Sequence, residues 1–139
     1  MIDTFLRSVL PAAAPCPHRR TFITAESLVA IGGVVGAAQL VTGTVAPPVT
    51  DLAPLGLTSW VLPGVWLAAT VAVPSATAAW LAWRRAPLAP TAVLAASGLL
   101  ALELGVQIPF VGPSVLQAVF GAVAVGLGGL AVHARRTGW

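Results

Sequence analysis

The sequence predicts an all-α membrane protein, a polytopic four-helix bundle with both termini in the cytoplasm. The first observation behind this fold class is composition: 58% of the 139 residues are hydrophobic and 8% are charged, and the mean hydropathy is +0.94. Such a composition is typical of membrane proteins and lies far from that of soluble domains. The second is a set of four apolar runs, and the third is the placement of the arginines.

Each apolar run is long enough to cross a bilayer, which takes about 20 helical residues. The four runs are residues 25–46, 60–83, 88–107 and 115–134. They are rich in Ala and Leu and lack alternation of apolar and polar residues, so they favour helices over strands. Together they define one membrane domain, residues 25–136, followed by a short tail at 137–139.

The positive charges predict the orientation of these helices. All of them are arginines, and they lie before the first run, between the second and third, and after the fourth. By the positive-inside rule this face is cytoplasmic, and the connections 47–59 and 108–114 lie outside. We therefore interpret six arginines as membrane anchors, namely Arg19, Arg20, Arg84, Arg85, Arg135 and Arg136. Pairs at membrane boundaries form no folded basic face, so nucleic acid is not an expected partner.

The first 24 residues are predicted to lie on the inner membrane surface. Their apolar side chains, Ile2, Phe5, Leu6, Val9 and Leu10, recur at helical spacing and predict a short amphipathic interfacial helix, followed by a tether. This apolar stretch is too short for a secretion signal and is interrupted by Pro11, so we expect no cleavage.

No catalytic, metal or cofactor motif stands out. The single Cys16 cannot form an internal disulfide, which disfavours thiol redox chemistry. His18 and His133 do not make a pair of axial haem ligands within a bundle. Hydrolase and phosphate-binding loop patterns are absent. We expect no cofactor and no metal, and catalysis is the less favoured interpretation.

Small residues at four-residue spacing predict close helix packing, against this chain or another. These candidates are Gly32 and Gly36 in the first run, Ser97, Ala101 and Gly105 in the third, and Gly128 in the fourth. Pro74, midway along the second run, predicts a kink whose freed carbonyl groups need partners.

A group of polar side chains in the outer half is the candidate ligand site. Glu103 and Gln107 lie one helical turn apart, and Gln39, Gln117 and Trp66 lie at similar depths. Because an intramembrane carboxyl is costly, we expect Glu103 to line an outward-opening polar pocket with these glutamines, accepting a proton or attracting a cation. The alternative is that the same groups only hold the helices together.

Two further interpretations stay open. Trp66 is deeper than an aromatic belt residue and either packs in the core or forms a ligand platform. Glu26 is placed in the first turn of the first helix, where it caps that helix near Arg19 or Arg20. A salt bridge from Glu26 to His133 is the less favoured alternative.

In length, number of spans and topology the chain resembles the small DoxX-like bacterial membrane proteins. This resemblance implies a four-helix fold in a bacterial inner membrane and transfers no functional residue. Arginine without lysine, with abundant alanine, also fits a GC-rich bacterial genome.

Three functions are consistent with the sequence. The first is an accessory or structural subunit, whose partners are the bilayer and either another membrane protein or further copies of this chain. The second is a small carrier or binding protein for a lipophilic or cationic ligand. The third is a membrane enzyme acting on lipid or quinone. It is the least favoured, because the sequence offers a lone carboxyl group without a metal, a nucleophile or a redox partner.

Overall fold

The computed structural model describes residues 16–139, which fold into helices without strands. Four helical segments are long and apolar enough to cross a membrane. They are α2 (Arg19–Thr42), the continuous segment α3 (Val61–Leu67), η2 (Ala68–Ala72) and α4 (Val73–Trp83), then α5 (Ala89–Val111) and α6 (Val115–Arg136). A short 3-10 helix, η1 (Val49–Leu55), lies between α2 and α3. The predicted interfacial helix at residues 2–10 lies outside the described residues.

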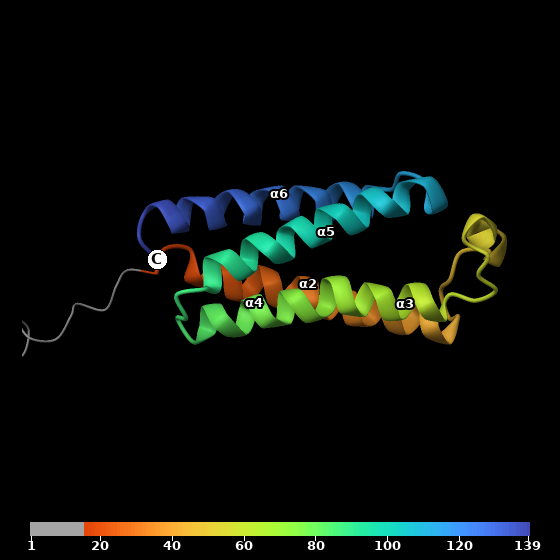
Figure 1. Ribbon diagram of the computed structural model, residues 1–139, viewed down its shortest axis with the longest axis horizontal. Coiled ribbons are helices and arrows are strands. Elements are labelled where there is room, and N and C mark those ends of the chain that lie inside the picture. The colour runs from red at the N-terminus through yellow and green to blue at the C-terminus, as the bar shows by residue number, and fades with distance from the viewer. Residues whose placement is uncertain (1–15) are drawn as a thin grey trace, which may run out of the picture.

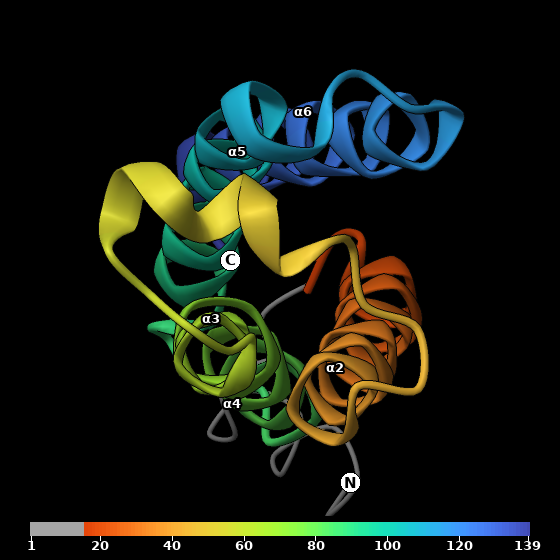
Figure 2. The same ribbon diagram turned by 90° about the vertical axis from the view of Figure 1, so that its right-hand side faces the viewer.

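Successive helices pack side by side. Along the length of the molecule α2 lies against α3 and α4, α4 contacts α5, and α5 pairs with α6 (Figure 1). Seen from the end, α5 and α6 form one pair above α2 and the α3–α4 segment (Figure 2). Gly32 of α2 lies beside the Phe120 ring of α6, so these two helices meet through a side chain.

The first helix begins earlier than predicted. It starts at Arg19 instead of residue 25, so residues 19–24 are helix and not tether. Two interactions hold this extra part: the Phe22 side chain is completely buried, and the Arg19 guanidinium donates to the Ala82 and Trp83 carbonyls at 3.0 and 2.7 Å. The helix also ends earlier, at Thr42, because Gly43 adopts a left-handed conformation there.

The arginines of the described chain gather at one end of the molecule. The start of α2, the turn between α4 and α5 and the end of α6 all lie at this end, whereas η1 and the α5–α6 turn lie at the other (Figure 1). Trp139 ties the arginine end together, since its indole N–H donates to the Ala86 carbonyl at 2.8 Å and its ring contacts Phe22.

Pro74 has a specific effect on the second span, the continuous segment of α3, η2 and α4. Proline lacks an N–H, and its ring clashes with the carbonyl four residues earlier, which here belongs to Thr70. Directly before Pro74 the helix widens into the π-helical turn η2. The Thr70 and Thr77 hydroxyls donate to the carbonyls of Trp66 and Val73, both at 2.9 Å.

Close packing falls mainly on glycines other than the predicted ones. A Cβ at Gly33 would lie 3.1 Å from the Ala72 nitrogen, and one at Gly64 would lie 2.8 Å from Val41 and 3.0 Å from the Ala37 carbonyl. These two glycines let α2 approach the second span.

Of the predicted small residues, Gly36 also packs closely, since a Cβ there would lie 3.2 Å from Leu67, and Ser97 is buried. Gly32 and Gly128 pack more loosely, with a Cβ 3.5 Å from Phe120 and 3.8 Å from Ser97. Ala101 is exposed, and a Cβ at Gly105 would meet nothing within 4 Å. Any helix packed on Ala101 and Gly105 is therefore not part of the described chain.

Candidate functional site

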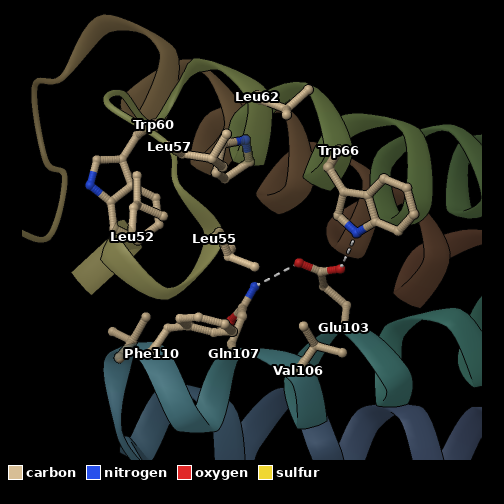
Figure 3. A pocket seen from close by; sticks show the side chains of 12 residues that line it. Leu52, Leu55, Leu57, Trp60, Leu62, Trp66, Glu103, Val106, Gln107 and Phe110 are labelled. Atoms are coloured by element: carbon tan, nitrogen blue, oxygen red, sulfur yellow. Dashed lines mark hydrogen bonds between the residues drawn. The ribbon is translucent and has the colours of Figure 1, made fainter. Parts of the chain in front are cut away.

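Glu103 is the centre of the candidate site. It lies on α5 with 8% of its surface exposed, and it faces the second span instead of the outside. The Trp66 indole N–H donates to Glu103 Oε2 at 3.0 Å, and the Gln107 amide donates to Glu103 Oε1 at 3.1 Å (Figure 3). One carboxyl oxygen therefore accepts a hydrogen bond from α3, and the other accepts one from the next turn of α5.

Thr70 is a third neighbour of the carboxyl group. Its hydroxyl lies 3.4 Å from Glu103 Oε2 but only 2.9 Å from the Trp66 carbonyl. A hydroxyl carries one proton, so the shorter contact takes it and the longer one is weak. Trp66 and Thr70 are one turn apart along the chain, so both side chains face Glu103 of α5.

Glu103 has no cationic partner in residues 16–139. Its hydrogen bonds come from neutral groups, and the arginines of this part of the chain lie at the opposite end of the helices. Within residues 16–139, therefore, no side chain supplies a positive charge to this carboxyl group.

Glu103 and Gln107 form part of the wall of a cavity of about 590 Å³. The other lining side chains are all apolar or aromatic: Leu52, Leu55, Leu57, Trp60, Leu62, Pro63, Trp66, Val106, Phe110 and Val111 (Figure 3). Glu103 thus lines a pocket and binds one of the expected glutamines, Gln107, but the rest of the described lining is apolar where we expected it to be polar. The reason is that loop leucines, and not the other glutamines, fill the space opposite Glu103.

The segment between α2 and α3 covers this cavity. Leu52 of η1 is almost completely buried, and Leu55 and Leu57 extend over the pocket. Trp60 is fixed beside them because its indole N–H donates to the Pro47 carbonyl at 2.8 Å. The cavity therefore lies between α3 and α5 beside the η1 loop, at the end without arginines, and it is open on one side, where Leu62, Val106 and Val111 are exposed.

A second, smaller cavity of about 260 Å³ lies among α2, α5 and α6. It is lined by Gly32, Gly36, Phe120 and Gln117 among others, and also by Glu103 and Gln107. The carboxyl–amide pair is thus common to the walls of both cavities.

The predicted site residues separate into two groups. Trp66 and Gln107 contact Glu103, and although 59% of the Trp66 surface is exposed, its only hydrogen-bonding group points at the carboxyl. Gln117 instead caps α6, exchanging hydrogen bonds with Ser114 at 3.1 and 3.2 Å. Gln39 is exposed on α2 and lines neither cavity.

Glu26 is not the interfacial cap that we expected. Because α2 begins at Arg19, Glu26 lies about 10 Å into the helix at 1.5 Å per residue. It is 1% exposed, and its carboxyl group has a hydrogen bond with Ser75 of α4 while Oε1 has no partner. Arg19 binds main-chain carbonyls, and the His133 ring lies 5.3 Å from that of His18, so neither forms the proposed ion pair.

Several site residues could not be found by sequence reasoning alone. Thr70 carried a usable signal, since it lies one turn after Trp66, but a threonine in an apolar run is usually bonded to its own helix. The loop leucines carried none, because nothing in the sequence shows that residues 52–57 turn back over the helices.

No metal site accompanies this arrangement in residues 16–139, where no group of three or more His, Cys, Asp and Glu side chains is placed to hold an ion. Comparison with protein-family models, with curated proteins and with solved structures finds no match for the chain. The fold and site together define its class: a small helical protein with four segments able to cross a membrane and an apolar cavity that contains one carboxyl group.

Proposed function

We propose that this protein is a multi-pass protein of a bacterial inner membrane that binds a lipophilic small molecule in the cavity beside Glu103. The observation that carries the proposal is the combination of an apolar cavity of about 590 Å³ with one convergent polar pair. Small-molecule sites have this size range and this character, with a few polar groups that fix orientation. A purely structural role for Glu103 would not require a cavity beside it.

The orientation of the site is part of the proposal. The positive-inside rule puts the arginine end in the cytoplasm, together with both chain termini. The cavity, near the opposite end, then lies in the outer half of the membrane and receives its ligand from the outer leaflet or the outer aqueous phase.

The test is native purification in lipid nanodiscs, followed by mass spectrometry of retained small molecules. We expect a retained molecule that is lost when the cavity is filled by Val106→Trp. A matched control is Val125→Trp, which adds the same side chain to an exposed position of α6 that lines neither cavity. Equal retention by wild type and Val106→Trp, or no bound molecule in either, would contradict the proposal.

An accessory-subunit role is the second candidate, favoured by the outward face of α5. Ala101 and Gly105 lie there with no helix of the described chain against them. Small residues at such a spacing allow another helix to approach closely. If a partner protein, or a second copy, packs there, Gly105→Leu abolishes its co-purification while leaving the cavity intact. A membrane enzyme acting on lipid or quinone is the third candidate.

A further inference from the structure

We propose that the molecule bound in the cavity is a protonated lipophilic amine, whose N–H groups bind Glu103 and Gln107 while its apolar part fills the space under η1. This inference rests on the proposed function and names the chemical class of its ligand. Three features of the site support it: the unused hydrogen-bonding groups, the absence of a positive charge beside Glu103 in residues 16–139, and the apolar lining of the cavity.

The polar groups of the site leave more acceptors than donors unused. The Trp66 indole N–H and the Gln107 amide both donate to Glu103, and the Thr70 hydroxyl donates to the Trp66 carbonyl. A carboxylate can accept about four hydrogen bonds, so Glu103 retains acceptor capacity. Gln107 Oε1 accepts no hydrogen bond from residues 16–139. The second N–H of the Gln107 amide is the one donor without a partner in residues 16–139, so a ligand head group that complements most of the unused atoms donates.

The charge of the site leads to the same class of ligand. An ionised carboxylate that is 8% exposed is costly without a counter-ion, and no Arg, Lys or His of the described residues lines the cavity. An alkylammonium group would supply both the positive charge and several N–H donors. A fatty acid would add a second negative charge, and a fatty alcohol would add one donor without charge.

The cavity lining suits the remainder of such a molecule. Trp60 lies beside Leu52 at the η1 side of the cavity, Leu55 lies between η1 and the Glu103–Gln107 pair, and Phe110 lies beside Gln107 (Figure 3). Alkyl chains are buried favourably against these surfaces, at roughly 25 cal/mol per Å².

The experiment measures binding of radiolabelled dodecylamine to the full chain in phosphatidylcholine nanodiscs, with binding to empty nanodiscs subtracted. Unlabelled dodecanol, dodecanoate and dodecyltrimethylammonium serve as competitors. We expect dodecylamine itself to compete at least tenfold more strongly than each of them, because only it has both the charge and the N–H donors. The ligand series needs no variant, so it tests the inference even if Glu103 is required for folding.

Glu103→Gln provides the second test. It should weaken dodecylamine binding at least tenfold and leave dodecanol binding unchanged, whereas the control Asp51→Asn, which removes a carboxyl group at the same end but outside the cavity lining, should change neither. If dodecanol or dodecyltrimethylammonium competes as well as dodecylamine, the amine inference is wrong while the lipophile-binding function stands. If no compound binds above the empty nanodiscs, the proposed function itself fails.

Discussion

At the scale of single residues, two buried carboxyl groups are held in different ways. Glu103 accepts hydrogen bonds from Trp66 and Gln107, so both of its oxygens have partners. Glu26 has a hydrogen bond with Ser75 but leaves Oε1 unpaired in the core. Because an unpaired buried polar atom costs about 1–3 kcal/mol, the two residues should respond differently to the loss of a neighbour.

Replacing Trp66 with Phe should remove the donor to Glu103 Oε2 and keep the ring. We expect a loss of about 1–3 kcal/mol in the free energy of unfolding, because a hydrogen bond to a buried carboxyl is broken. Thermal unfolding in detergent measures the loss. The matched control is Trp83→Phe, at an exposed indole with no hydrogen bond to the described residues. Equal melting temperatures for Trp66→Phe and wild type would show that this bond contributes nothing.

The Glu26–Ser75 pair allows a test by double substitution. Ser75→Ala alone leaves the Glu26 carboxyl without its hydrogen bond and should destabilise the protein by about 1–3 kcal/mol. Glu26→Met with Ser75→Ala replaces both partners by apolar groups and should restore the stability to the wild-type value or above. A double variant less stable than Ser75→Ala would mean that Glu26 has an essential partner other than Ser75. The four thermal unfolding curves of this cycle decide the matter.

The site was predictable from the sequence only where partners share a helix or a depth. Glu103 and Gln107 are one turn apart on α5, so their contact follows from helix geometry. Gln39 was expected at a similar depth, but it is exposed and lines neither cavity, so a shared depth alone does not bring a side chain to Glu103. Gln117 follows Ser114 by three residues, which is the signature of a capping box and could have assigned it to α6 in advance.

At the scale of elements, the second span determines how the site is presented. Pro74 predicts an interruption, and the structure shows a π-helical turn before it. The turn contains Thr70 and begins two residues after Trp66, so a change in its geometry reaches the hydrogen bonds on Glu103. A sequence predicts that proline disturbs a helix, but the type of disturbance depends on packing against α2 and α5.

Pro74→Ala should allow the turn to close into an ordinary α-helix. A π-helical turn holds one residue more than an α-helical turn, so closing it rotates the preceding segment by about 100° relative to α4. We expect Trp66 to leave Glu103 and any ligand binding in the cavity to fall, while overall helicity remains. A shift in Trp66 fluorescence measures the rotation, and a conservative control is Pro87→Ala, in the exposed α4–α5 connection. Unchanged Trp66 fluorescence would show that the π-helical turn is held by its neighbours and not by Pro74.

At the scale of the whole molecule, the two ends have different chemistry. One end gathers the arginines and is fastened by Arg19 and Trp139, while the other carries η1 and the cavity. The four spans were predictable from composition and length because a bilayer demands about 20 apolar residues in each. The closure of η1 over the cavity was not, since it depends on contacts between segments distant in sequence.

The orientation of these ends in the membrane decides from which side a ligand reaches Glu103. We expect Thr58→Cys, in the connection beside the cavity, to react with a membrane-impermeant maleimide in intact cells. Pro87→Cys, at the arginine end, should react only after permeabilisation; both positions are exposed, and both variants are made in a Cys16→Ser background. The positive-inside rule is the reason for this expectation. The opposite labelling pattern would place the cavity on the cytoplasmic side, and a lipophilic amine would then have to come from the cell interior.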